Sequence, residues 1–202
     1  MRIFFFVAVF LICSLSFIPS PKTELESEFL EQIIVQERGS ITYVRESWGW
    51  EKMKELLNRK VFYDYNLDNR NSIELTDSEY NFILNEIDAN RNHIWSPKLL
   101  KNAESIDQNE IESYLLRKSQ PVKSELKEHL KLNATSAVVK LKNKMPLAFS
   151  FSKPIFFRKG TLCIFAYSVV THDNLGNYKQ IAFYKKEKGK WVENLEIYNS
   201  LN

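Results

Sequence analysis

Residues 161–170, Thr-Leu-Cys-Ile-Phe-Ala-Tyr-Ser-Val-Val, decide the fold of this 202-residue chain. The run is rich in β-branched and aromatic residues, a composition typical of a half-buried or buried strand. Turn-forming segments that contain glycine, asparagine or aspartate separate it from similar runs. The sequence therefore predicts five strands, at 148–151, 154–158, 161–170, 178–186 and 190–198. Short connections between consecutive strands predict an antiparallel meander.

Before residue 133 the spacing of apolar residues is helical. Thr76 and Glu79 form a capping-box pattern, and an apolar stripe follows at Tyr80, Ile83, Leu84 and Ile87. We expect helices at 24–38, 51–59, 76–89, from 96, at 107–117 and at 125–132, with Pro121 separating the last two.

An extended piece at 41–44 and an aromatic segment at 61–65 that docks on the core complete the expected elements. Helices first and strands second indicate an α+β fold, with N-terminal helices packed on a C-terminal antiparallel β-meander of about four to five strands. The stripe of the helix at 76–89 is expected to cover one face of the sheet.

The N-terminus has the pattern of a secretory signal peptide, expected to span 1–16. Arg2 precedes an apolar run too short to span a membrane, and small residues follow that run. We expect a flexible tail at 17–23 and a single α+β domain at 24–202, with a helical part at 24–133 and a sheet part at 134–202. The chain is thus expected to be exported, to the periplasm or the extracellular space.

Two alternatives concern this leader. It could stay uncleaved and anchor a structural protein in the membrane. Cys13 could carry a lipid, but Phe10 and Ile12 occupy positions where a lipobox has leucine and a small residue, so lipid anchoring is the less favoured outcome.

Composition narrows the classes of function. The net charge is only +3 and is spread along the chain, so no nucleic-acid partner is expected. Cys163 is the single cysteine after the leader and lies in an apolar run, which indicates a buried core thiol. The three histidines are scattered, so we expect no metal site, and with only five glycines and no phosphate-binding loop we expect no cofactor. No transmembrane segment beyond the leader is expected.

Four residues near the opening strands are candidates for binding. Ser152, Lys153 and Arg158 could form a basic rim with Tyr167 if the sheet has an open face. The alternative is that lysines on edge strands simply block unwanted strand pairing. Trp48 and Trp50 flank Gly49 and could present aromatic rings to a partner or a sugar, although indoles more often pack into a core.

His172 and Asp173 lie in a loop between strands and could act as a base and its orienting group. This pair supports an alternative reading as an envelope hydrolase. No serine or cysteine nucleophile can be placed beside it from the sequence.

Three C-terminal segments carry a recognisable pattern: Phe151–Arg158, Leu162–Tyr167 and Tyr184–Trp191. They resemble a group of small exported proteins of unknown function common in Bacteroidota, whose pattern is S-K-P-I-F, then Y, then Y-K-K-x-x-G-K-W. Residues 75–95 are similar to the helix and tryptophan that precede the sheet in that group. Many members carry paired Cys-Gly steps in the loop after the long strand, but residues 171–176 contain no cysteine. The resemblance implies export and the sheet layout but no particular activity, and the missing cysteines argue against a disulfide or redox role for this loop.

These observations favour an exported, non-enzymatic protein that recognises another macromolecule, as an inhibitor, an immunity-type module or an adaptor of the cell envelope. Its expected partner is another envelope or secreted protein. Contact is expected through the uncovered face or the edge of the sheet.

Overall fold

The computed structural model describes residues 21–35, 41–63, 71–131, 146–171 and 177–201. Its helices are α2 (Pro21–Leu30), a π-helical turn (Glu31–Val35), α3 (Trp50–Leu56), α4 (Asp77–Asn90), a 3-10 turn (Gln108–Glu110) and α5 (Ile111–Lys131). Its strands are β1 (Ile41–Val44), β2 (Val61–Tyr63), β3 (Ser72–Glu74), β4 (Ala103–Ile106), β5 (Leu147–Phe151), β6 (Ile155–Phe157), β7 (Leu162–Thr171), β8 (Tyr178–Glu187) and β9 (Lys190–Leu201). The predicted leader lies outside these residues, and α2 begins within the segment predicted as a tail.

The architecture is α+β, and the main sheet is mixed. Its strand order is β4-β1-β5-β7-β8-β9, with β6 paired to β7 beyond the end of β5. All five predicted C-terminal strands form, and the pairs β7–β8 and β8–β9 are antiparallel as expected.

The prediction of a purely antiparallel meander is wrong. β1 pairs in parallel with both β4 and β5. Parallel neighbours need long connections, so this pairing depends on contacts between distant segments and leaves no turn signal in the sequence. Both β1 and β4 lie in the N-terminal part of the chain, which is expected to be helical apart from the extended piece at 41–44.

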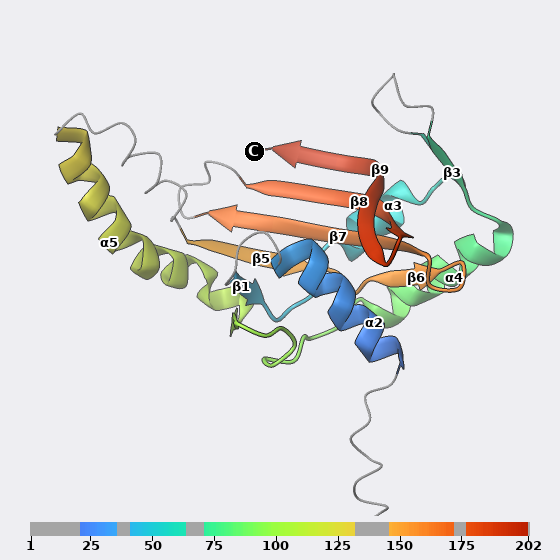
Figure 1. Cartoon of the computed structure of the whole chain (residues 1–202), viewed down its shortest axis with the longest axis horizontal. Coiled ribbons are helices and arrows are strands. Elements are labelled where there is room, and N and C mark those ends of the chain that lie inside the picture. Colours follow the sequence, from blue (N-terminus) through green and yellow to red (C-terminus); the bar gives the residue numbers. More distant parts are fainter. Residues whose placement is uncertain (1–20, 36–40, 64–70, 132–145, 172–176, 202) are drawn as a thin grey trace, which may run out of the picture.

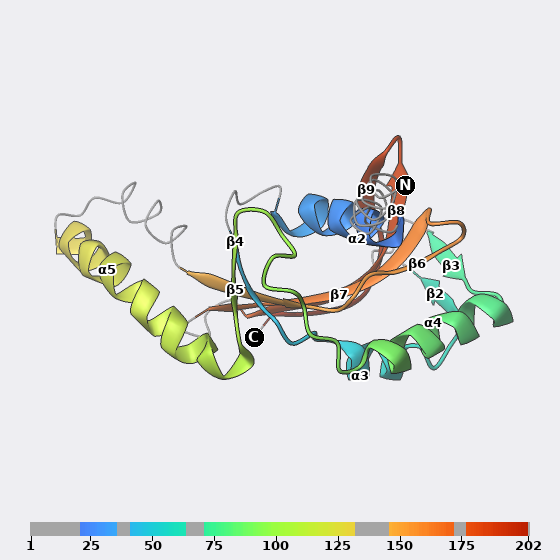
Figure 2. The same cartoon turned by 90° about the horizontal axis from the view of Figure 1, so that it is seen from below.

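Helices pack on both faces of the sheet, although part of the α2 face, at Tyr167 and Tyr178, is only half-buried. Figure 2 shows α2 on one side, and α3, α4 and the β2–β3 hairpin on the other. Helix α5 starts against the β1 and β5 end of the sheet and then extends away from the body of the molecule (Figures 1 and 2). This arrangement follows from the strands themselves, because residues on both faces of β7 from Leu162 to Ala166 are buried.

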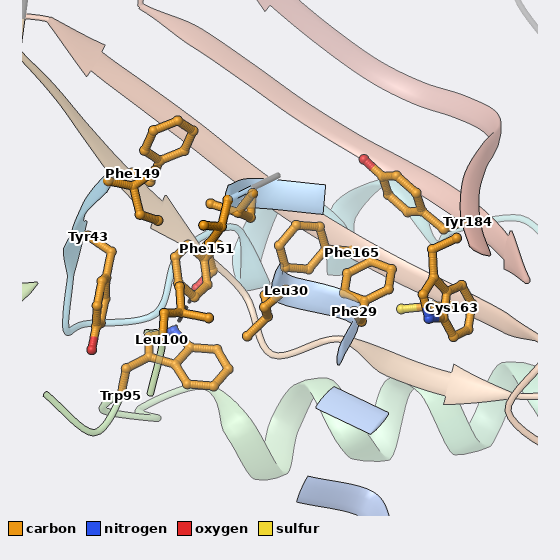
Figure 3. Packing of buried hydrophobic residues seen from close by; sticks show 14 of the residues in the cluster. Phe29, Leu30, Tyr43, Trp95, Leu100, Phe149, Phe151, Cys163, Phe165 and Tyr184 are labelled. Carbon is orange, nitrogen blue, oxygen red and sulfur yellow. Dashed lines mark hydrogen bonds between the residues drawn. The ribbon is translucent and has the colours of Figure 1, made fainter. Parts of the chain in front are cut away.

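Aromatic residues make up half of the buried cluster on the α2 side of the core. Phe29 of α2 packs edge-on against Phe165, Tyr184 and Trp191 of three consecutive strands. Figure 3 shows Phe29, Phe165 and Tyr184 in the same cluster as Trp95. Cys163 belongs to this cluster and is fully buried, as predicted, and burial raises the pKa of its thiol well above the usual value.

The opposite side of the core is mainly aliphatic. Ile83 and Ile87 of α4 are buried there, with Tyr80 and Leu84 partly buried beside them. The predicted stripe and its role as a cover are thus confirmed, and so is the capping box, since Thr76 Oγ1 accepts a bond from the Glu79 N–H. Of the aromatic segment expected at 61–65, residues 61–63 are described, and they dock as expected through Phe62, which is fully buried; residues 64 and 65 lie outside the described residues.

Two helix predictions are wrong. Residues 96–101 form turns instead of a short helix. Helix α5 continues through Pro121, so the two helices expected at 107–117 and 125–132 are one. The signal from Pro121 is local, and a helix can keep its course across one missing N–H when the turns on both sides remain bonded.

Candidate functional site

The four residues predicted for binding lie in separate contacts. Ser152 is fully buried at a break between β5 and β6. Its Oγ accepts a bond from the N–H of Ala166 at 3.0 Å, and its own N–H donates to the carbonyl of Ala166 at 2.8 Å. Ser152 therefore forms hydrogen bonds with β7 at the point where Pro154 interrupts the neighbouring strand. Its hydroxyl already has a hydrogen-bond partner inside the protein.

Lys153 lies at the same break and reaches the α2 side. Its Nζ is 3.8 Å from Oε1 of Glu26, and only 22% of its side chain is exposed. Burial lowers the pKa of His93, and the nearby charge of Lys153 lowers it further. The imidazole meets the ring of Trp95 edge-on at 4.5 Å.

Arg158 lies at the α4 side of the sheet and ties a turn to that helix. Its guanidinium donates to Glu79 Oε1 at 2.7 Å and to the carbonyl of Glu74 at 2.6 Å. The hydrogen bond from Arg158 is the main reason that the pKa of Glu79 falls to about 2. These contacts give Arg158 a structural role, and they keep it apart from Lys153.

Tyr167 is the predicted residue that belongs to a surface cluster. Its ring stacks on Phe165 at 6.1 Å and lies 5.7 Å from the ring of Tyr178 on β8. Both tyrosines are half-buried and lie on the α2 face of the sheet.

Polar side chains from β8 and β9 continue this cluster. The buried amide of Gln180 donates to Glu193 Oε2 at 2.8 Å and to Glu196 Oε2 at 2.6 Å. The hydroxyl of Tyr184 donates to the Gln180 carbonyl oxygen at 3.3 Å. One amide thus holds two carboxylates beside three phenol rings. We call Tyr167, Tyr178, Gln180, Tyr184, Glu193 and Glu196 the tyrosine–glutamate platform.

The electrostatics of the platform follow from burial and negative charge. Burial raises the pKa of Tyr178 far above the ordinary phenol value, and Tyr167 and Glu196 add to the effect. Burial likewise raises the pKa of Tyr184, followed by Tyr167 and Glu193. Both shifts favour the uncharged phenols of Tyr178 and Tyr184.

This arrangement suits a cationic side chain. Carboxylates accept charge-assisted hydrogen bonds from a guanidinium or an ammonium group, and tyrosine rings attract cations to their faces. Glu193 is exposed and Glu196 half-buried, so both can be reached from solvent.

Sequence reasoning missed five of the six platform residues. Tyr178, Gln180 and Tyr184 stand at even spacing on one strand, a signal that they share a face. Glu193 and Glu196 share that face only because the register between β8 and β9 shifts at Phe183/Tyr184. Such bulges have no signature in this sequence.

His172 and Asp173 lie outside the described residues, so their geometry stays a prediction. Within the described ranges, no group of three or more His, Cys, Asp or Glu side chains could hold a metal ion. No helix of the described chain is both long and apolar enough to cross a membrane.

Comparisons of the chain with protein-family models, with curated proteins and with solved structures found no match. The resemblance to exported Bacteroidota proteins therefore stays a prediction.

Proposed function

We propose that this chain is an exported protein that recognises another envelope or secreted protein, as an inhibitor, an immunity-type module or an adaptor. The contact surface is the tyrosine–glutamate platform. The observation that carries the proposal is the convergence of Glu193 and Glu196 on the single amide of Gln180. It fixes two negative charges next to tyrosine rings, and tyrosine is enriched in protein interfaces.

The platform favours an arginine or lysine side chain as the group that docks. A guanidinium can bind carboxylates through its planar fork and stack on a tyrosine ring at the same time. Negative charge at the surface also speeds the approach of a basic partner, and salt weakens that effect. The hydrolase alternative rests on His172 and Asp173, and no described residue adds an observation in its favour.

Site-specific photo-crosslinking in the native host tests the contact. A crosslinking residue at exposed Asn199, whose amide donates to Glu196 at 3.1 Å, should capture one defined protein. The same residue at Tyr63, which is 67% exposed on β2, is the control. We expect the adduct from position 199 to weaken in high salt and to disappear in the double variant Glu193→Gln/Glu196→Gln. Equal adducts at both positions, or none at 199, would contradict the proposal.

Export is tested separately. The intact mass of the protein purified from the host should match cleavage after Ser16. A larger mass consistent with an acylated Cys13 would instead indicate a lipid anchor, and a full-length product in the cytosol would rule out export.

A further inference from the structure

A second surface feature, on the opposite side of the sheet, is an open recess of about 360 Å³. Two segments form it: residues 47–52, where α3 begins, and residues 91–92, which follow α4. Its volume is in the range of pockets that hold small ligands. None of its lining residues belongs to the tyrosine–glutamate platform.

The aromatic part of the recess is held rigidly. Gly49 has a φ of +92° and lies flat on β7, where a Cβ at this position would be 2.5 Å from the Cβ of Ala166. The N–H of Trp48 donates to the carbonyl of Phe151 at 3.1 Å. The indole N–H of Trp50 donates to Ser47 Oγ at 2.6 Å. The backbone that carries both tryptophans is thus preorganised, which reduces the entropy lost on binding.

The two tryptophans differ in exposure. Trp50 is 4% exposed and belongs to the core, as the packing interpretation of the sequence expected. Trp48 is only partly buried and lines the recess. Trp48 therefore offers the aromatic surface that a ligand can reach.

The polar part of the recess has charges of both signs. Arg91 and Glu51 form an ion pair, both with exposed side chains, and Asn92 adds an amide that donates and accepts. Lys52 is held by Glu55 at 2.8 Å. An anionic ligand would meet the Glu51 carboxylate, a cationic ligand would meet Arg91, and an apolar ligand would cover these charges without replacing their hydrogen bonds.

A neutral ligand with an apolar face and several hydroxyl groups fits all of these groups. A sugar ring has both: its C–H face can pack on an indole, and its hydroxyls can donate to Glu51 and accept from Arg91 and Asn92. We propose that this recess binds a neutral saccharide. The site goes beyond the proposed protein contact and does not depend on it.

Saturation-transfer NMR on the mature protein tests this site with defined probes. The probes are glucose, galactose, N-acetylglucosamine, and the β-1,4-linked trisaccharides of glucose and of N-acetylglucosamine. Because the recess is open, we expect at least one probe to bind with a Kd of about 1 mM and to show transfer to its ring C–H protons. The absence of transfer from every probe at about ten times that concentration would overturn the proposal.

Matched variants assign binding to the recess. Trp48→Ala should weaken binding of the positive probe about tenfold, which corresponds to about 1.4 kcal/mol. Arg91→Ala, a change of an exposed side chain that leaves the core intact, should also weaken it. Tyr63→Ala on β2 is the control and should leave affinity unchanged. Binding that survives both Trp48→Ala and Arg91→Ala, or inorganic phosphate competing more strongly than any sugar, would refute a saccharide site here.

Discussion

The two faces of the sheet are packed in different ways. On the α2 side, Phe29 alone meets four aromatic rings at 5.0 to 5.7 Å, those of Phe156, Phe165, Tyr184 and Trp191. On the α4 side, aliphatic residues share the contact, and ion pairs such as Lys54–Asp88 and Arg158–Glu79 surround it. The first face is built on a network of rings in which Phe29 and Phe165 each contact four others, whereas the second distributes its packing over many aliphatic side chains.

The two proposed binding sites lie on different faces of the sheet. The aromatic cluster extends along β7 and β8 into Tyr167 and Tyr178, so the tyrosine–glutamate platform is the polar continuation of the α2-side core. The saccharide recess instead lies where loops meet the α4 side. Changes to one face should therefore leave the site on the other face intact.

The largest expected effect comes from removing the central ring. Phe29→Ala should destabilise the protein by about 4 kcal/mol, because it deletes a fully buried side chain and leaves a cavity among four rings. Phe82→Ala on α4 is the matched control, since that ring is 42% exposed, and it should cost less than about 1 kcal/mol. Chemical denaturation of both variants measures the difference, and similar losses would contradict a central packing role for Phe29.

The second effect tests the contact that supports the recess. Gly49→Ala should cost about 3 kcal/mol, because it adds a Cβ at positive φ and forces that Cβ against Ala166. Gly189→Ala has a similar φ of +80° with no atom nearby, so it should cost only about 1 kcal/mol.

A double-mutant cycle separates the backbone cost from the steric one. In an Ala166→Gly background the steric contact is absent, so Gly49→Ala should there cost only the backbone share. If the cost of Gly49→Ala is the same in both backgrounds, the close approach to Ala166 is not its cause.

The strands that could be predicted are those whose signals are local. β7, β8 and β9 have alternating or continuous apolar runs and glycine-containing turns, and α4 has a capping box and a stripe. β4 contains Ala-Glu-Ser-Ile, a sequence without β preference, and becomes a strand because β1 pairs with it in parallel. Tertiary contacts over about sixty residues decide that pairing, which no window of sequence can show.

The same reasoning applies to the candidate site. Tyr167 could be singled out because it lies on the long strand, but its neighbours depend on the β8–β9 register and its bulges. The sequence suggests an accessible Ser152, but this residue is buried. At the break before Pro154, its side chain replaces a hydrogen bond between strands. The sequence suggests that Arg158 belongs to a basic rim, but its guanidinium is hydrogen-bonded to Glu79, a residue distant in sequence.

The third effect concerns the ion pair between Arg158 and Glu79 on the α4 side of the sheet. The folded-state pKa of Glu79 is about 2, below the unfolded value of about 4.3. The pair therefore stabilises the fold fully above about pH 4.3 and loses this contribution as the pH falls toward 2. In Glu79→Gln this part of the acid dependence should be missing, which denaturation between pH 5 and pH 3 measures. A variant that loses the same stability as the wild type over that range would contradict the assignment.

The smallest expected effect is a shift in the pKa of one tyrosine at each end of the sheet. Burial is the main cause of the raised pKa of Tyr178, and the charge of Glu196 is one of the smaller causes. Glu196→Gln should therefore lower the pKa of Tyr178 slightly. Glu104→Gln is the matched control, because at the other end of the sheet burial raises the pKa of Tyr114 and Glu104, which accepts a bond from that phenol, raises it further.

Tyrosine ring carbons followed by NMR through alkaline titration distinguish the two phenols. In the Glu196→Gln variant the Tyr178 signal should begin to move at lower pH while Tyr114 is unchanged, and Glu104→Gln should give the reverse. If both variants move both tyrosines equally, the effect is a general change of net charge, and the tyrosine–glutamate platform has no local field of its own. A local field at the platform is what a basic partner needs in order to bind there in preference to the rest of the surface.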